Sequence, residues 1–360
     1  MKLLFALLHF MSLSALAHTH KPFIFTSFND FQLEGVITHT NKKPKGVAFL
    51  ILQGSGPQSY DGDFSSITRP IGSENLYYKT IAELLASNGI SSARYNKRSF
   101  QHIKNKDTTS KQFQNFKQNP LYYFIKDASH ILDTLKKNTF KDKEIYILGH
   151  SQGSYIALQV AHLNKVSGIV HIGFSATSIS ETLFEQLVYR PLHIFKIIDL
   201  DQNQLLDATE LEVKLPEAEV LKKNMKHLDA NHDKHLSISE VKSGNLAQQE
   251  YFKRGLKSYI SHEQALPTAT EILENSTTKQ LFLQGEWDNQ TPSYNVKSIQ
   301  FLNSKVWNKN IFTFSYYKER GHALDKRNSV NDSEYTILDD EVKKRIIQDI
   351  EEFTKKVTKL

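Results

Sequence analysis

The amino-acid sequence predicts an α/β fold in which a mostly parallel sheet is covered by helices on both faces. Short apolar runs that are typical of strands alternate with amphipathic stretches of helical spacing. Alternation of this kind is the pattern of parallel strands joined by helical connections. We expect strands at residues 22–28, 31–38, 46–53, 91–95, 144–148, 168–173, 280–284 and 311–317.

Two of the expected helices have strong sequence signals. Asn119 followed by Pro120 predicts a helix start, because Asn is a favoured N-cap and Pro fits the first helical position. Downstream, apolar residues recur at intervals of three and four along one face: Ile125, Ala128, Ile131, Leu132 and Leu135. A final helix is predicted by similar spacing at Val342, Ile346, Ile347, Ile350 and Phe353.

The composition is that of a globular, enzyme-sized protein. The chain has 360 residues, and 39% of them are hydrophobic, so it can bury the core of a large α/β domain with an insertion. The formal net charge is +6, but Lys and Arg are scattered and alternate with acidic residues. Because a nucleic-acid-binding surface needs clustered basic residues, no nucleic-acid partner is expected.

The first 17 residues predict a signal peptide. Lys2 supplies the positive start, an apolar stretch runs to Ala15, and Ala15 and Ala17 fit the small-x-small cleavage rule. The stretch is shorter than the roughly 20 residues that a transmembrane helix needs, and no other apolar run is long enough. The chain has no cysteine and so no disulfides. We therefore expect an exported bacterial protein, periplasmic or secreted, without a transmembrane segment.

The segment at residues 144–161 predicts a catalytic nucleophile. An apolar, β-branched run ends in Gly149-His150-Ser151-Gln152-Gly153, and a helical pattern begins at once. A strand that turns this sharply into a helix strains the backbone of the serine and leaves room only for small residues on either side. The serine hydroxyl then stands above the sheet edge, beside the positive helix N-terminus. Ser151 is the predicted nucleophile.

A second glycine cluster follows the expected strand at 46–53. In this type of site, one oxyanion-binding N–H comes from the residue after the nucleophile, here Gln152, and another from a loop after an upstream strand. The segment Gln53-Gly54-Ser55-Gly56 lies in the corresponding place. Ser55 is the predicted second donor, and Gly56 is the alternative.

A nucleophilic serine needs a base, and the base needs an orienting acid, in the chain order Ser, acid, His. Asp288 follows the strand at 280–284, and His322 follows the strand at 311–317, so Asp288 is the predicted acid and His322 the predicted base. The rival acids are Glu286, Asp325 and Asp332, and the rival histidines are His171 and His262.

Several segments together resemble the α/β-hydrolase superfamily, and in particular its exported bacterial esterase-like members. They are LILQGSGPQSYDGD, IAELLASNGISSARYNKRS, GHSQG, GEWDNQTP and GHAL, and the resemblance covers residues 22–175 and 271–358. It implies hydrolysis of an ester, thioester or amide without an organic cofactor. The sequence departs from many relatives at Gln152, where they carry an acidic residue, and at residues 96–99, where they carry Asp-Arg-Gly.

The region at residues 176–270 interrupts the alternation of strands and helices and is predicted to be a helical cap. It contains two acidic segments that match the twelve-residue EF-hand calcium loop at positions 1, 3, 5, 9 and 12. Position 7 offers a carbonyl oxygen in each loop. The predicted ligands are Asp199, Asp201, Asn203, Leu205, Asp207 and Glu210 in the first loop, and Asp229, Asn231, Asp233, His235, Ser237 and Glu240 in the second.

Both loops depart from the EF-hand pattern at position 6, where glycine is preferred because the turn needs a positive φ. Gln204 and Lys234 stand there, and each should cost about 1 kcal/mol of turn strain. Position 8 is apolar in both loops, at Leu206 and Leu236, as expected where paired loops are bridged by a short strand.

The sequence thus predicts a signal peptide at 1–17, a hydrolase core at 18–175 and 271–360, and a helical cap at 176–270. The predicted function is that of a serine hydrolase that forms an acyl-enzyme on small-molecule or lipid-like acyl esters, with two structural or regulatory Ca²⁺ ions in the cap. The alternative is a calcium-dependent binding protein on a hydrolase scaffold that no longer turns over.

Overall fold

The computed structural model describes residues 18–213, 216–328 and 335–357. The predicted signal peptide at 1–17 and the rival acid Asp332 lie outside these described residues. Within the described ranges, no helix combines the length and apolar character that a membrane crossing requires.

The centre of the molecule is an eight-stranded sheet with the spatial order β1-β2-β4-β3-β5-β6-β9-β10. The strands are β1 (His18–Thr26), β2 (Gln32–Thr40), β3 (Val47–Leu52), β4 (Ser91–Tyr95), β5 (Glu144–His150), β6 (Gly168–Ile172), β9 (Gln280–Gly285) and β10 (Phe312–Tyr317). β2 pairs antiparallel with β1 and β4, whereas every other pair is parallel. All eight expected strands and the mostly parallel sheet are confirmed. β1 begins four residues earlier than expected, because His18 already pairs with Thr40.

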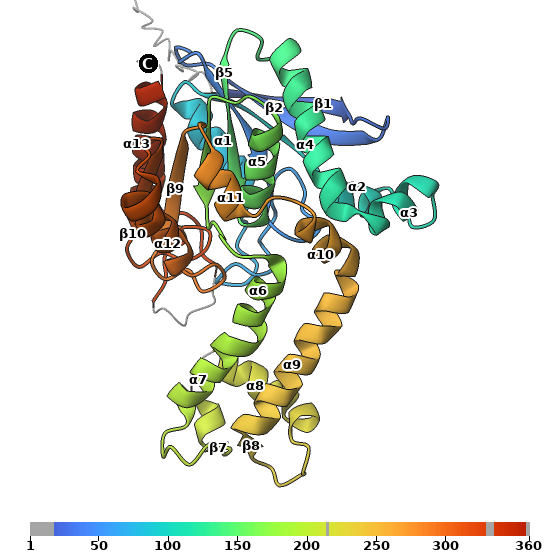
Figure 1. Ribbon diagram of the computed structural model, residues 1–360, viewed down its shortest axis with the longest axis vertical. Coiled ribbons are helices and arrows are strands. Elements are labelled where there is room, and N and C mark those ends of the chain that lie inside the picture. The colour runs from blue at the N-terminus through green and yellow to red at the C-terminus, as the bar shows by residue number, and fades with distance from the viewer. Residues whose placement is uncertain (1–17, 214–215, 329–334, 358–360) are drawn as a thin grey trace, which may run out of the picture.

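Helices cover both faces of the sheet (Figure 1). On one face lie α1 (Tyr77–Ser87) and α13 (Asp340–Val357), and on the other lie α4 (Pro120–Lys137), α5 (Gln152–Leu163), α11 (Ala269–Asn275) and α12 (Tyr294–Leu302). The short helices α2 (Arg98–Lys104) and α3 (Lys111–Gln118) precede α4. Helix α4 begins at Pro120 as expected, although the Asn119 side chain makes no capping hydrogen bond.

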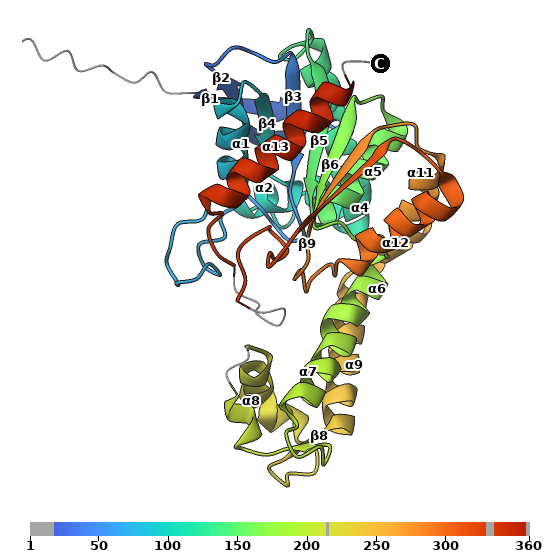
Figure 2. The same ribbon diagram turned by 90° about the vertical axis from the view of Figure 1, so that its left-hand side faces the viewer.

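The chain between β6 and β9 projects from the sheet as two long helical arms (Figures 1 and 2). The first arm contains α6 (Ile179–Phe184), a π-helical turn (Glu185–Tyr189) and α7 (Arg190–Ile198), and the second is α9 (Ile238–Gly255), followed by α10 (Lys257–Gln264). At the far end lie β7 (Leu205–Leu206), a 3₁₀ turn (Glu210–Glu212), α8 (Pro216–Leu228) and β8 (Leu236–Ser237). This end has its own small core, formed by Ile194, Phe195, Ile198, Leu206, Leu211, Ala218, Leu221, Leu236 and Val241.

The parallel strands bring the loops that carry the predicted catalytic residues to one edge of the sheet. β3, β5, β9 and β10 run in the same direction, so their carboxyl ends meet there. Ligand sites of open α/β sheets lie at this edge because the loops that follow adjacent strands converge on it. The sheet therefore provides the frame on which residues distant in sequence are gathered.

Candidate active site

Ser151 occupies a strained turn between β5 and α5. Its φ of 55° and ψ of −125° lie in a region that non-glycine residues rarely adopt. A Cβ on Gly149 would lie 2.4 Å from the Gly153 carbonyl oxygen, and one on Gly153 would lie 2.3 Å from the Leu52 oxygen. The close approaches explain the two glycines, as the sequence predicted for this turn. The Ser151 N–H also donates to the Ile172 carbonyl at 2.8 Å, which ties the turn to β6.

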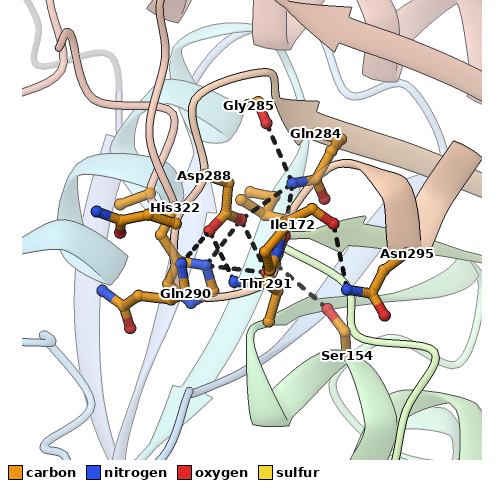
Figure 3. Close-up of polar contacts among 12 residues, drawn as sticks. Ser154, Ile172, Gln284, Gly285, Asp288, Gln290, Thr291, Asn295 and His322 are labelled. Atoms are coloured by element: carbon orange, nitrogen blue, oxygen red, sulfur yellow. Dashed lines mark hydrogen bonds and ion pairs between the residues drawn. The ribbon is translucent and has the colours of Figure 1, made fainter. Parts of the chain in front are cut away.

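Asp288 and His322 lie together although 34 residues separate them (Figure 3). His322 Nδ1 is 2.9 Å from Asp288 Oδ2, and the two residues are 1% and 3% exposed, respectively. Their loops can approach because Gly285 packs on the backbone of the other loop, where a Cβ would be 2.2 Å from the Gly321 oxygen. The structure thus brings the predicted acid and base into direct contact.

The other ring nitrogen of His322, Nε2, is buried without a hydrogen-bond partner among the described residues. The His322 ring lies 4.9 Å from the ring of His150, the residue that precedes Ser151. Gly173 directly follows Ile172, whose carbonyl accepts from the Ser151 N–H. A Cβ on Gly173 would lie 2.7 Å from His322 Nδ1. These contacts place the His322 ring beside the turn that carries Ser151. His322 Nε2 is available there to accept a hydrogen bond.

Sequence reasoning missed Thr291, which contacts both members of the buried pair (Figure 3). Thr291 Oγ1 donates to Asp288 Oδ2 at 2.8 Å and lies 3.1 Å from His322 Nδ1. Asp288 Oδ1 accepts from the N–H groups of Gln290 and Thr291, and Gln284 Nε2 donates to Oδ2 at 3.0 Å. The turn pattern Asp-x-x-Thr was the available signal, because Asp side chains accept from N–H groups two and three residues on.

The rivals for the acid and base have other environments. Asp325 is buried with its Oδ2 3.2 Å from Arg327 Nε, and Glu286 is exposed to solvent. His171 lies inside β6, stacked on Phe282, and burial lowers its pKa to about 4. His262 lies on α10, beside Tyr122. None of these residues contacts the Asp288–His322 pair through a hydrogen bond among the described residues.

Hydrogen bonds fix the backbone of the predicted oxyanion loop on both sides of Gly54. The Gly54 N–H donates to the Tyr78 hydroxyl at 2.8 Å, and the Gly54 carbonyl accepts from Lys97 Nζ at 2.6 Å. A Cβ on Gly54 would lie 3.2 Å from Ser151 Cβ, so this loop abuts the serine. Both Ser55 and Gly56 border the same cavity as Ser151 and Gln152, so both remain candidates for the second donor.

A cavity of about 350 Å³ opens at Ser151, within the range of small-molecule sites. The core contributes Ser151, Gln152 and Thr291 to its wall, and the base of the helical arms contributes mainly apolar and aromatic side chains. These side chains are Ile179, Leu183, Phe252, Leu256 and Tyr259, together with Thr182, Gln186 and Glu263. The predicted insertion therefore borders the cavity through its base, whereas its two acidic loops lie at the far end of the arms (Figures 1 and 2).

The two acidic loops adopt matching conformations. Gln204 and Lys234, at position 6 of each loop, have φ values of 65° and 68°, which is the left-handed conformation that the sequence pattern required. Their N–H groups donate to Asp199 Oδ2 and Asp229 Oδ2, each at 3.0 Å. β7 and β8 pair antiparallel and place Leu206 opposite Leu236, so position 8 of one loop faces position 8 of the other.

The first loop can accommodate a cation by the chemistry of its donors. One oxygen each of Asp199, Asp201 and Glu210 lie within 4.8 Å of one another, and Asp199 Oδ1 is buried with no hydrogen-bond partner in the part of the chain that the structure describes. Oxygen donors gathered in this way suit a hard cation such as Ca²⁺. In the second loop, Glu240 accepts from the N–H groups of Ala230 and Ser237, as Glu210 does from Leu200 and Asp207 in the first.

Comparison with known proteins agrees with this architecture. Esterase EstD of Thermotoga maritima is 32% identical over 158 residues, which are 44% of this chain and 34% of that protein. The chain thus spans about a third of the length of this curated relative.

Solved structures share the fold at low sequence identity. An esterase of Pyrococcus furiosus superposes with a TM-score of 0.51 at 12% identity, over 94% of this chain and 92% of that one. A Staphylococcus aureus protein of unknown function gives 0.51 at 12% identity, over 93% and 99%. The family described as the alpha/beta hydrolase fold matches residues 72–310, two thirds of the sequence, and the chain belongs to this family.

Proposed function

We propose that this protein is a serine esterase in which Ser151 is the nucleophile, His322 the base and Asp288 the orienting acid. The observation that carries the proposal is the buried 2.9 Å contact between His322 Nδ1 and Asp288 Oδ2, beside a strained serine that borders a cavity. The unpaired Nε2 of His322 supports the assignment, because a general base needs one ring nitrogen free to accept the serine proton.

The reaction follows from these positions. Ser151 Oγ attacks the acyl carbon while its proton passes to His322 Nε2, and the tetrahedral oxyanion is held by the backbone N–H groups of Gln152 and Ser55. The imidazolium returns the proton to the departing alkoxide, which leaves an acyl ester on Ser151. Water then attacks this ester, with His322 again taking the proton, and releases the carboxylic acid.

The cavity supports an acyl ester as substrate. Most of the side chains that the arms contribute to its wall are apolar or aromatic, which suits an acyl chain, and Ser151 borders the same cavity. The esterase name of the relative from Thermotoga maritima agrees with an ester, while thioesters and amides require the same chemistry.

Calcium is the second part of the proposal. Asp199, Asp201, Asn203, Asp207 and Glu210, with the Leu205 carbonyl, would hold one ion, and the corresponding residues from Asp229 to Glu240 would hold another. The buried, unpaired Asp199 Oδ1 and the positive φ at Gln204 and Lys234 support this assignment. At these residues a bound ion would neutralise the gathered carboxylates and order the end of the arms, and we propose that its role is structural rather than catalytic.

We also propose export, with cleavage after Ala17. The test is N-terminal sequencing of the protein recovered from the periplasm or medium. His18 as the first residue is the expected result, and a retained Met1 in the exported fraction would contradict it.

A fluorophosphonate probe tests the catalytic proposal, because it reacts covalently with activated serines. The labelled peptide should contain Ser151, and Ser151→Ala should lose both labelling and turnover of acyl esters of graded length. Ser175→Ala is the matched control, since Ser175 borders the same cavity and hydrogen-bonds to Thr177 instead. Full ester turnover by Ser151→Ala would refute the assignment, and an unlabelled, inactive wild type would favour the non-catalytic binding protein.

A further inference from the structure

Lys97 is a buried cation at the carboxyl end of β4. Its side chain is 4% exposed, and its ammonium group lies 4.5 Å from the ring centroid of Phe124. Nζ donates to the Gly54 carbonyl at 2.6 Å and to Gln152 Oε1. Among the described residues it has no ion-pair partner, and both acceptors of its hydrogen bonds are neutral. Burying a charge in this way is costly unless another group compensates for it.

The first acceptor links Lys97 to the oxyanion loop. The Gly54 carbonyl belongs to the same peptide group as the N–H of Ser55, the proposed second donor. The Gly54 N–H is fixed by the Tyr78 hydroxyl, so the chain is held on both sides of this residue. A charged donor on the carbonyl also polarises the peptide group and makes its N–H a stronger hydrogen-bond donor.

The second acceptor links Lys97 to the other proposed donor. The Gln152 side chain accepts from Lys97, and Gln152 lines the cavity together with Tyr259 of α10. The backbone N–H of Gln152 is the donor that directly follows Ser151 in the sequence. The Lys97 ammonium group thus contacts the peptide group that carries the Ser55 N–H and the side chain of Gln152. These two residues supply the proposed oxyanion donors.

We propose that Lys97 is the positioning residue of the oxyanion site. Through the Gly54 carbonyl and the Gln152 side chain it orients the Ser55 and Gln152 N–H groups, and its positive charge stabilises the tetrahedral oxyanion that forms during the reaction. This inference rests on the serine-esterase assignment. It also accounts for the missing counter-ion, because the negative charge that balances Lys97 forms only in the transition state. Interactions realised only there raise kcat rather than substrate affinity.

The protonation of Lys97 gives the proposal a pH signature. Burial lowers the pKa of Lys97 to about 7, so the ammonium loses its proton as the pH rises through neutrality. The charged residues near Lys97 are Arg98 of α2 and Asp127 of α4, which form an ion pair with each other at 2.5 Å. Tyr78, Tyr95 and Tyr259 remain neutral, because burial raises the pKa of each phenol. The oxyanion site should therefore weaken above pH 7.

The test compares Lys97→Met with the wild type and with Lys104→Met, a matched control on the exposed side of α2 that pairs with Glu34. Steady-state kinetics from pH 6 to 9.5 and the affinity for a trifluoromethyl ketone, which forms a tetrahedral adduct with the serine, are measured for all three. We expect Lys97→Met to lower kcat about 10- to 100-fold, less than the loss of a direct oxyanion donor, with KM changed less than threefold. The affinity for the ketone should fall by a similar factor.

The wild type should lose activity above pH 7, and this decline should be absent in Lys97→Met. A folded Lys97→Met enzyme that keeps kcat within twofold, or that keeps the alkaline decline, overturns the proposal. Thermal unfolding reports whether the variant folds. If Lys97→Met does not fold, the pH dependence of the wild-type kcat is the test. A wild-type kcat that stays constant from pH 7 to 9.5 also overturns the proposal. Fluorophosphonate labelling of Ser151 in the wild type separates these outcomes from failure of the esterase assignment.

Discussion

His322 Nδ1 lies 2.9 Å from Asp288 Oδ2 in an environment where neither residue is more than 3% exposed. Burial by itself would raise the pKa of Asp288, but the charge of His322 and the hydrogen bonds from His322 and Thr291 outweigh it, so the pKa is lowered. Asp288 therefore stays ionised, which is what the proposed triad requires of the group that stabilises the imidazolium form of His322.

Replacing Asp288 by Asn is expected to lower kcat by about 10³- to 10⁴-fold, because the amide can no longer hold the required tautomer of His322. Ester hydrolysis under saturating substrate measures the loss. Glu286→Gln serves as the control, since Glu286 is exposed in the same loop. Equal kcat values for the two variants would show that Asp288 is not the orienting acid.

Thr291→Val removes one hydroxyl and preserves the shape of the side chain. The variant loses the 2.8 Å hydrogen bond to Asp288 Oδ2 and the contact with His322 Nδ1. A hydrogen bond to a charged group is worth about 1.5–3 kcal/mol, but part of this can be recovered from Gln284, so we expect kcat to fall about 3- to 10-fold. Thr291→Ser should restore most of the activity. No difference between the Val and Ser variants would assign Thr291 a packing role only.

The calcium proposal predicts that Lys234→Gly binds Ca²⁺ more tightly at the second loop than the wild type does. Lys234 has a φ of 68°, and a non-glycine residue pays about 1 kcal/mol for this conformation. Because glycine also costs entropy in the unfolded chain, the net gain should be about 0.5–1 kcal/mol, or two- to fivefold in affinity. Isothermal titration with Ca²⁺ measures the change, and Lys242→Gly on α9, where glycine weakens a helix, is the contrasting control. Weaker binding by Lys234→Gly would contradict the assignment of position 6.

Glu263 makes stability depend on pH. Burial raises its pKa from the usual 4.5 to about 7, so the folded protein favours the protonated carboxyl. Stability contributed by this group is present below pH 4.5 and is lost as the pH rises towards 7. Glu263→Gln keeps an acceptor for the Ile179 N–H, so it should raise Tm by roughly 1–3 °C at pH 8.5 and by less at pH 5.5. Glu250→Gln on exposed α9 should show no such difference between the two pH values.

The Arg98–Asp127 ion pair is buried on both sides, with side chains that are 0% and 1% exposed. Asp127→Asn leaves the Arg98 charge in the interior without its partner and should lower the free energy of unfolding by about 3–5 kcal/mol. Urea denaturation measures this loss, with Asp133→Asn on the same helix as the control. A change below 1 kcal/mol would mean that Ser27 and Asn29, which also accept from Arg98, compensate for the carboxylate.

The sequence alone determined the strands, the turn at Ser151 and the two acidic loops. These features depend on periodicity and on residues within a few positions of one another. Examples are the two glycines beside Ser151, where a side chain would clash with backbone atoms, and the left-handed conformation of Gln204 and Lys234. The order of Asp288 and His322 along the chain was also enough to select the pair that the fold joins, because both follow parallel strands that end at one edge.

Only the tertiary structure decided which side chains surround those residues. Lys97 meets Gly54 and Gln152 across 43 and 55 residues, and Thr291 meets His322 across 31. The course of the helical arms likewise depends on packing, which places Tyr259 at the cavity and the acidic loops far from it. Local patterns carry no record of such contacts, since their energies arise from burial and hydrogen bonding between segments that meet only when the sheet has formed.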